Sequence, residues 1–210
     1  MLATRDGHTG ARWAAALDGA GPWRVLMPVH SLAETRLMLG RTPPTLLLIE
    51  PALVDGPVHE LLRTLQLRTP AERILTLVVT EHEDDTRLLD LLQAGADSIL
   101  ARPFDAQLLA GAVHDALAGG ADIAPWVARR LLEHFGVGQP ALASQRVEEL
   151  SNPLALTADE GQLLRRLALG YRLGELAREA DVSARELTAC VRRIYRKMQW
   201  TLRAGDLQLV

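Results

Sequence analysis

Apolar runs alternate with amphipathic stretches over roughly the first 118 residues of the chain. The apolar runs are short and lack polar alternation, which is typical of strands buried on both faces of a sheet. There are five of them, at residues 1–4, 23–29, 45–50, 74–80 and 98–101. Apolar residues recur at helical spacing between them, near 9–18, 31–40, 57–68, 84–94 and 105–118. Strand alternating with helix predicts a parallel sheet with helices on both faces. The first part of the chain is therefore expected to form an α/β doubly wound domain with a five-stranded parallel sheet.

The alternation stops after residue 118. A helix is predicted from about Pro125 to Phe135, and the segment that follows it is rich in Gly, Pro and Ser, as linkers are. From Leu156 onward the apolar spacing is helical to the end, with no candidate strand. These changes divide the chain into a first domain at 1–118, a connecting helix and linker at 119–155, and an all-α domain at 156–210.

Two helices of the last segment begin with the same device. The stretches "TADE" (157–160) and "SARE" (183–186) both match S/T-x-x-E, in which the hydroxyl and the Glu side chain each accept a free backbone N–H. A glycine stop at Gly170 and a tight turn before Ser183 divide the segment into three helices. Three short helices with a tight turn before the third are typical of a helix-turn-helix.

The third of these helices has two different faces. At roughly 100° per residue, Leu187, Val191, Ile194 and Met198 share one narrow stripe, which is expected to pack in the core. Five basic residues and one acid lie between 184 and 197, and arginine binds phosphates and guanine edges through paired donors. The opposite face is therefore predicted to bind double-stranded DNA, although charges on a helix are also common on a merely solvated face. The candidate contact residues are Arg185, Thr188, Ala189, Arg192, Arg193, Arg196 and Lys197.

The stretch from 156 to 198 resembles the LuxR-type helix-turn-helix. The shared positions are Leu156-Thr157, Glu160, Leu164, Leu167-Ala168, Gly170, Glu175, Ala177, Val182-Ser183, Leu187, Ile194 and Arg196-Lys197, without a gap. This resemblance implies that the helix after Ser183 enters the major groove and that "TLRAGDLQLV" (201–210) forms a last helix. The sequence departs from the family pattern at Glu186, Thr188, Cys190, Arg192 and Arg193, so the resemblance does not imply a preferred base sequence.

Residues 1–118 resemble the receiver domain of NarL-like response regulators, most clearly over 95–120. The resemblance implies a flavodoxin-like strand order and places Glu50 at the phosphoacceptor position, where the family has Asp. Thr80 matches the hydroxyl position of the family, and Arg102 replaces its Lys. The acidic pair that the family carries after the first strand is reduced to Arg5-Asp6. The expected residues of a degenerate phosphoacceptor pocket are thus Asp6, Glu50, Thr80 and Arg102.

The chemistry of phosphorylation explains why these replacements matter. Phosphoryl transfer to a carboxylate needs Mg²⁺ held by several oxygens, and one Asp and one Glu beside two arginines make a poor magnesium site. Neither a metal nor a cofactor is therefore expected. Glu50 is then either one half of a salt bridge with Arg102, which would offset the cost of a charge at the end of an apolar strand, or structural filler. Ile99 stands where the family has the aromatic residue that couples the pocket to the surface.

Charge and composition separate the two parts further. Residues 151–210 hold ten basic and seven acidic residues, and the totals of 23 and 26 leave 13 basic and 19 acidic residues for 1–150. An acidic first part and a basic second part indicate modules with different partners. The single cysteine excludes an internal disulfide, and the six histidines show no metal-binding spacing. No apolar run approaches the roughly 20 residues of a membrane span, and the N-terminus lacks a signal peptide pattern, so a cytoplasmic protein without a membrane partner is expected.

These observations together predict a transcription regulator and not an enzyme. The expected protein is an atypical response regulator that acts independently of phosphorylation and binds DNA as a homodimer, because two half-sites raise specificity. A regulatory protein or a small ligand at the receiver is the expected replacement for the phosphoryl signal. Two alternatives stay open: a protein-binding adaptor that has lost specific DNA recognition, and a regulator that is switched by phosphorylation.

Overall fold

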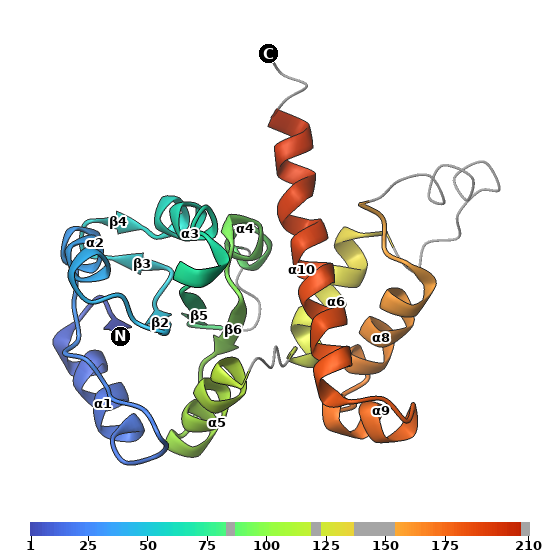
Figure 1. The fold of residues 1–210 in the computed structure, drawn as a ribbon, viewed down its shortest axis with the longest axis horizontal. Helices are drawn as coiled ribbons and strands as arrows, with labels where there is room; N and C mark the ends of the chain where they lie inside the picture. Colours follow the sequence, from blue (N-terminus) through green and yellow to red (C-terminus); the bar gives the residue numbers. More distant parts are fainter. Residues whose placement is uncertain (83–86, 119–122, 137–153, 207–210) are drawn as a thin grey trace. The chain divides into compact units, whose positions relative to one another are not determined.

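The computed structural model describes residues 1–82, 87–118, 123–136 and 154–206, with only the backbone for 201–206. The chain divides into two compact units, Met1–Ala121 and Asp122–Val210, which are called the first unit and the second unit below (Figure 1). Within the described part, no helix is both long enough and apolar enough to cross a membrane.

The first unit is built on a parallel sheet of four strands in the order β1-β2-β5-β6. These strands are β1 (Leu2–Ala3), β2 (Leu46–Ile49), β5 (Leu75–Thr80) and β6 (Ser98–Ala101). Leu48 of β2 pairs with Leu2 on one side and with Leu77 on the other. All four residues of β2 are buried, which explains why its sequence is apolar without alternation.

Five helices surround this sheet, close to the predicted ranges. They are α1 (Gly7–Leu17), α2 (Leu32–Arg41), α3 (His59–Gln66), α4 (Leu88–Ala94) and α5 (Ala106–Leu117). Helices α1 and α5 lie on one face of the sheet, and α3 and α4 lie on the other (Figure 1). The predicted start of the fourth helix, near residue 84, lies outside the described residues. The predicted doubly wound arrangement is therefore present.

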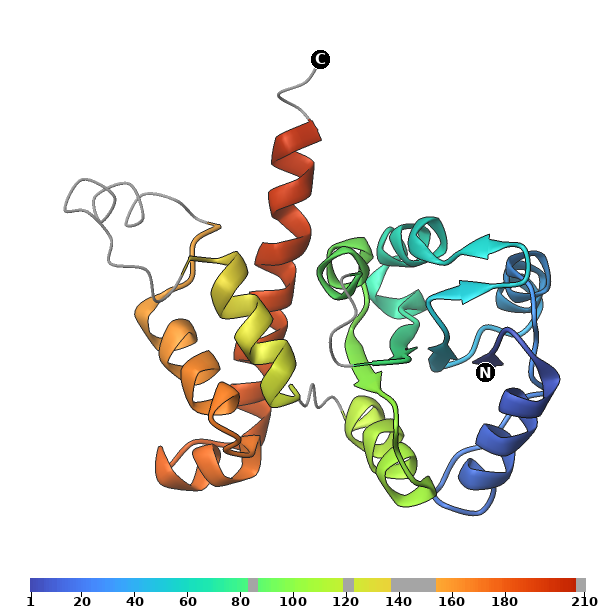
Figure 2. The ribbon, with the colours of Figure 1, turned by 180° about the vertical axis from the view of Figure 1, so that it is seen from behind.

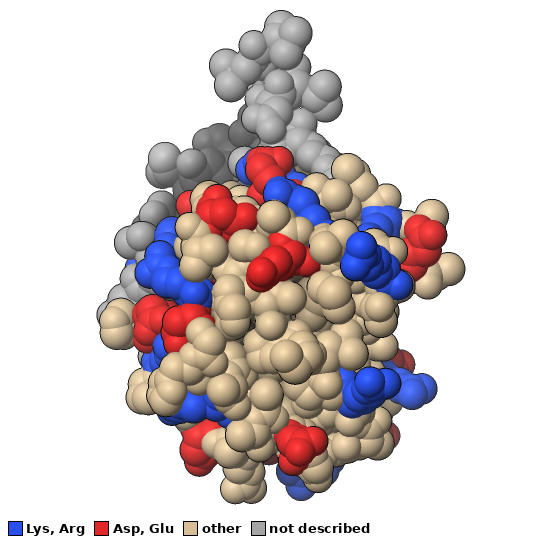
Figure 3. Space-filling view, turned by 90° about the vertical axis from the view of Figure 1, so that its left-hand side faces the viewer, with Lys and Arg blue, Asp and Glu red and all other residues tan. Residues whose placement is uncertain are grey.

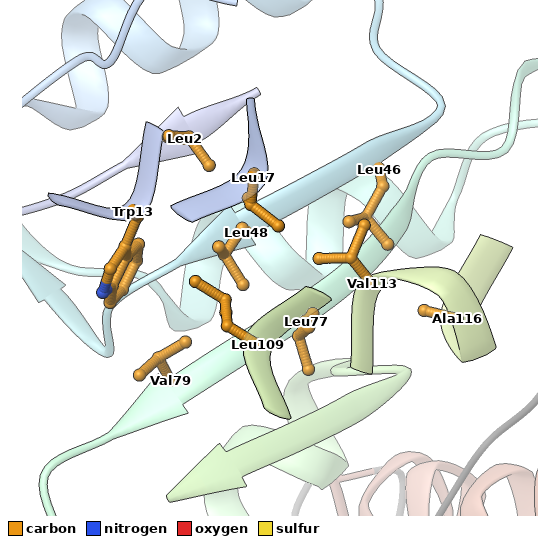
Figure 4. Packing of buried hydrophobic residues seen from close by; sticks show 10 residues of the cluster. All are labelled: Leu2, Trp13, Leu17, Leu46, Leu48, Leu77, Val79, Leu109, Val113 and Ala116. Atoms are coloured by element: carbon orange, nitrogen blue, oxygen red, sulfur yellow. The ribbon is translucent and has the colours of Figure 1, made fainter. Parts of the chain in front are cut away.

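The core between the sheet and the α1/α5 face joins residues far apart in the sequence. Its buried members are Leu2, Trp13, Leu17, Leu46, Leu48, Leu77, Val79, Leu109, Val113 and Ala116 (Figure 4). Trp13 of α1 is only 5% exposed, and Phe104, which precedes α5, packs against the same cluster. This cluster holds α1 and α5 against one face of the sheet.

The expected second strand at 23–29 does not form, so the prediction of five strands was wrong by one. Only Val29 pairs with β1, through an isolated bridge to Ala3. Val29 N–H donates to the Leu2 carbonyl, and Thr4 N–H donates to the Val29 carbonyl, each at 3.0 Å. Pairing extends no further, and β1 itself is only two residues long. Met27, one residue earlier, is 82% exposed.

A small hairpin follows β2 and was not predicted. Strands β3 (Ala52–Leu53) and β4 (Gly56–Pro57) pair antiparallel. Asp55 in its turn accepts Leu32 N–H on Oδ1 at 2.5 Å and Ala33 N–H on Oδ2 at 3.1 Å. The hairpin therefore caps the N-terminus of α2 from a distance in the sequence, in addition to the local cap by Ser31.

Four helices form the described part of the second unit. They are α6 (Pro125–His134), α8 (Ala158–Ala168), α9 (Leu173–Glu179) and α10 (Ala184–Asp206). Helix α6 packs along α8, as the view from behind shows, and Arg129 Nη1 donates to the Ala168 carbonyl at 2.9 Å (Figure 2). The helix predicted at about 125–135 is thus part of the same compact unit as the three helices that follow it.

Both predicted capping boxes are present in the second unit. Thr157 N–H donates to Glu160 Oε2 at 2.8 Å, and Glu160 N–H donates to Thr157 Oγ1 at 3.2 Å. Ser183 and Glu186 repeat the same exchange at 2.8 and 3.2 Å. A tight turn joins α9 to α10, in which Val182 N–H donates to the Ala177 carbonyl at 3.0 Å. The local sequence therefore determines where α8 and α10 begin.

Helix α10 departs from the expectation at its other end. It runs unbroken from Ala184 to Asp206, so residues 201–206 continue it and do not begin a separate last helix. The remainder of the expected last helix, 207–210, lies outside the described residues. Of the predicted core stripe, Val191, Ile194 and Met198 are fully buried, whereas Leu187 is only half-buried.

Candidate functional site

Helix α10 presents several of its arginines to solvent on one side. Arg185, Ala189, Arg193 and Arg196 are exposed, and Arg192 is half-buried. At roughly 100° per residue they share one face of the helix, opposite the buried Ile194 and Met198. These five residues are called the arginine face below. The small side chain of Ala189 keeps the middle of this face low, so a phosphate or a base edge can approach the helix closely.

Two of the predicted DNA-contact residues do not belong to the arginine face. Thr188 is buried, with 7% exposure, because it lies on the same side of α10 as the buried Tyr195 and packs within the unit. The Lys197 side chain is 16% exposed and turns inward to an ion pair. Their burial sets both residues apart from the exposed arginines, since helical spacing alone does not tell how wide the packed side of a helix is.

Trp200 is a candidate contact that the sequence interpretation did not select. Its side chain is 53% exposed. It follows Arg196 by one helical turn and lies about 40° from it around the axis. The angular position could be calculated from the sequence, but a tryptophan at the end of an amphipathic helix is more often part of a core or an interface.

The buried carboxylate of Glu160 connects α10 to the start of α8. Its Oε2 accepts Lys197 Nζ at 2.6 Å, and Arg193 Nε lies 3.7 Å from Oε1. Lys197 Nζ also donates to the Ala155 carbonyl at 2.7 Å. Burial raises the pKa of the Glu160 carboxyl, but the hydrogen bonds from Lys197 and from the Thr157 N–H outweigh burial and lower this pKa below its usual value. The residue therefore stays ionised and acts as an anchor inside the unit.

In the first unit, the candidate pocket lies where the parallel strands end. Glu50 follows β2 directly and is 7% exposed. Its Oε1 accepts Arg102 Nη2 at 2.6 Å, and its Oε2 accepts Arg5 N–H at 2.5 Å. Of the two readings left open by the sequence, the salt bridge is the one present, and both oxygens of the Glu50 carboxylate are engaged by groups of the same chain.

Arg102 has further partners around Glu50. Its Nη1 lies 3.2 Å from Glu81 Oε1, just beyond the end of β5. The guanidinium carbon lies 5.4 Å from the centroid of the Trp13 ring, within reach of a cation–π interaction. Trp13 in turn packs against Phe104, with ring centroids 6.3 Å apart. Arg102 thereby joins α1, β2 and the segment after β5.

The other two predicted pocket residues serve local structure. Asp6 is exposed and caps α1 by accepting Thr9 N–H at 2.8 Å, a bond that lowers the pKa of the Asp6 carboxyl. Thr80 is fully buried, and its hydroxyl donates to the His82 carbonyl at 3.3 Å. Among the described residues, no group of three or more His, Cys, Asp or Glu side chains could hold a metal ion. Of the four predicted residues, the structure brings only Glu50 and Arg102 into contact.

The side of the first unit that carries α1 and α2 has no surface charge of a single sign. Acidic and basic side chains lie around a broad central area that carries neither (Figure 3). Such a mixed surface lacks the electrostatic footprint that attracts nucleic acid. The arginine face of α10 is therefore the stronger candidate for a polyanion.

No family model matches the sequence, and no curated protein matches it. Solved structures match over nearly the whole chain. RcsB, a response regulator of Salmonella typhimurium, has a TM-score of 0.54 and 15% identity over 94% of this chain and 89% of its own. RcsB dimers bound to two parallel DNAs give 0.55 and 14%, with 96% of each chain covered. The response regulator ChrA of a heme-sensing two component system gives 0.50 and 20%, with 99% and 96% covered. These likenesses show that the chain has the fold of response regulators.

Proposed function

We propose that this chain is a DNA-binding transcription regulator of the cytoplasm, with a LuxR-type helix-turn-helix in its second unit and an atypical receiver of the NarL type in its first. The observation that carries the proposal is the arginine face. Three exposed arginines, Arg185, Arg193 and Arg196, lie on one side of α10 directly after a capped turn. An exposed row of guanidinium groups on α10, the helix after the tight turn, is suited to binding phosphates and guanine edges.

The departures from the family pattern at Glu186 and Thr188 count less against DNA binding than the sequence indicated. Glu186 accepts Ser183 N–H at 2.8 Å, so its carboxylate is used to cap α10. The same bond lowers the pKa of this carboxyl. Thr188 is buried and lies away from the arginine face. The alternative of an adaptor without DNA recognition rests on the loss of the usual family residues at 186 and 188, and these contacts weaken that ground.

The receiver is proposed to act without phosphorylation. The carboxylate at the phosphoacceptor position is a glutamate with both oxygens bonded to Arg102 and Arg5. Asp6, the remaining acid of the expected pocket, is used to cap α1. A magnesium ion needs several oxygen ligands, and the contacts of these residues favour a fixed salt bridge over a metal site. A partner protein or a small ligand then supplies the regulation.

A homodimer is part of the proposal. One short helix contacts few base pairs, and two copies on neighbouring half-sites multiply specificity. The matching structure of RcsB contains dimers bound to DNA, which agrees with this arrangement for a related fold.

Selection of bound sequences from random double-stranded DNA tests the proposal directly. We expect enrichment of a sequence with two related half-sites, and binding of that sequence should fall steeply as salt concentration rises. The double variant Arg185→Ala/Arg196→Ala is the matched control, because both side chains are exposed and the fold should persist. Absence of any enriched sequence, with no salt-dependent binding of the full chain, would contradict the proposed function.

A further inference from the structure

Lys197 is unusual in this chain for its identity and its surroundings. It is the only lysine among 23 basic residues. Its side chain is 16% exposed, compared with 58% for Arg193 one turn earlier on α10. A lysine that served as a phosphate contact would extend into solvent from the surface of the helix. Lys197 instead reaches into the second unit.

The ammonium group of Lys197 joins three segments of the second unit. It donates to Glu160 Oε2 of α8 at 2.6 Å and to the Ala155 carbonyl, just before α8, at 2.7 Å. Glu160 is itself 2% exposed and accepts the Thr157 N–H at the start of α8. The middle of α10, the first turn of α8 and the residues that lead into α8 are thereby tied to one buried charge pair.

The chemistry of the pair favours lysine at this position. An ammonium is a compact point charge with three donors that can turn toward separate acceptors, whereas a guanidinium is a flat fork suited to one bidentate partner. Two acceptors from different segments, Glu160 and Ala155, meet at one nitrogen here. All other basic residues of this chain are arginines, and the single lysine lies where two acceptors bind one nitrogen.

We infer that Lys197 and Glu160 are positioning residues for DNA binding: their pair fixes α10 against α8 and so holds the arginine face in place, without itself touching DNA. The inference rests on the proposed function, and it replaces the sequence-based assignment of Lys197 as a DNA contact. Arg193 of the arginine face also lies close to this pair, because its Nε is 3.7 Å from Glu160 Oε1. Loss of the ammonium would loosen α10 against α8 and so misalign the arginine face as a whole, without removing any of its guanidinium groups.

The salt dependence of DNA binding distinguishes a residue that positions the helix from a residue that contacts a phosphate. A side chain that neutralises a phosphate contributes a slope of about 0.9 to the plot of log affinity against log salt concentration, whereas a positioning residue contributes none. We expect Lys197→Met to weaken binding about tenfold, the size of one lost specific contact, with the slope unchanged. Arg196→Met, the exposed neighbour, should lower the slope by about one unit.

The double variant Glu160→Gln/Lys197→Met keeps the test valid if Lys197→Met fails to fold. Removing one partner leaves a buried charge unpaired, whereas removing both leaves none, so the double variant should fold even where Lys197→Met does not. Because the two residues act as one unit, its affinity should equal that of Lys197→Met within about twofold, not the product of two separate losses. Circular dichroism of each variant checks the fold.

NMR of the full chain labelled with ¹⁵N-lysine observes the group directly, since a single lysine gives a single ε-ammonium signal. In the folded protein its protons should exchange slowly, and the signal should keep its shift when the selected DNA is added. A slope lowered by about one unit in Lys197→Met, or a shift of the ammonium signal on DNA, would overturn the inference and leave the proposed function intact. Absence of salt-dependent DNA binding by the unaltered protein would overturn both.

Discussion

The guanidinium of Arg102 lies 5.4 Å from the centre of the Trp13 ring while it pairs with Glu50 at 2.6 Å. A flat cation can use its face and its edge at the same time, stacking on an aromatic ring while it donates to carboxylates. A lysine at this position could form the ion pair, but it lacks the planar guanidinium that reaches Trp13 as well. The arginine therefore ties the carboxylate to the core of the first unit, which a simple salt bridge would not do.

Removal of Arg102 should destabilise the first unit. In Arg102→Ala, Glu50 keeps a charge at 7% exposure with only the Arg5 N–H to compensate it. We expect a loss of about 2 kcal/mol in the free energy of unfolding, below the 3–5 kcal/mol of a fully buried pair because the arginine is 27% exposed. Urea unfolding measures the loss. Arg63→Ala, which breaks an exposed pair with Glu60, should cost less than about 0.5 kcal/mol. Equal losses in the two variants would contradict the prediction.

The protein should not respond to phosphodonors. Incubation with Mg²⁺ and acetyl phosphate, or with a beryllofluoride mimic, is expected to leave NMR shifts, oligomer size and DNA affinity unchanged, because Arg102 occupies the Glu50 carboxylate. Glu50→Asp should not restore a response while Arg102 is present. Saturable changes that vanish in Glu50→Ala would instead favour a regulator switched by phosphorylation.

The arginine face should govern the salt dependence of DNA binding. Arg185→Ala and Arg196→Ala should each weaken binding and lower the slope of log affinity against log salt by about 0.9 for each lost phosphate contact. A salt series by gel shift or fluorescence anisotropy measures both quantities. Arg63→Ala in the first unit is the control of equal charge and should change neither. Unchanged affinity in the folded double variant Arg185→Ala/Arg196→Ala would mean that another surface meets the DNA.

Acid should weaken the second unit through Glu160. The folded pKa of this carboxyl is lowered, so its contribution to stability is complete above the unfolded value near 4.5 and is lost as pH falls through the folded pKa. Glu160→Gln lacks this contribution at every pH. Hydrogen exchange of the α10 amides should therefore differ between the two proteins at neutral pH, and the difference should shrink as pH falls below the unfolded pKa. A difference that stays constant with pH would contradict the role of the ionised carboxylate.

Cys190 should be unreactive in the folded protein. Burial raises the pKa of its thiol, and the residue is 8% exposed. Thiolate is the reactive form, so modification by a thiol reagent at pH 8 should be slow until denaturant is added. Because the chain has one cysteine, mass spectrometry counts the modified fraction without ambiguity. Rapid modification without denaturant would show that α10 separates readily from its unit.

Local signals in the sequence were sufficient where a few neighbouring residues determine the outcome. The capping boxes at Thr157 and Ser183 and the buried run of β2 depend on contacts within one turn or one strand, and the structure contains all three. The fifth strand was predicted from its apolar residues, but pairing also depends on the length of β1. That condition involves a second segment, which the run 23–29 does not reveal.

The candidate sites show the same division. Glu50 and Arg102 could be paired from the sequence only through the family resemblance, and the bond exists. The contribution of Trp13 could not be foreseen, because it depends on how α1 crosses the strand ends. On α10, the spacing of the sequence places Thr188 around the helix axis, but the width of the packed side depends on α8 and α9. The angular position of Lys197 likewise does not reveal that Glu160 lies buried within its reach.

Asp55 accepts two hydrogen bonds from the start of α2, so the stability of this helix depends on the length of the β3–β4 hairpin. Asp55 lies 23 and 22 residues after its partners Leu32 and Ala33, with α2 and β2 between them. An inserted or deleted residue in the turn between β3 and β4 would carry the carboxylate away and leave those amide groups unsatisfied. Such a change would act as a helix mutation although it lies in a surface loop, so this turn should tolerate substitution of Val54 far better than any change in its number of residues.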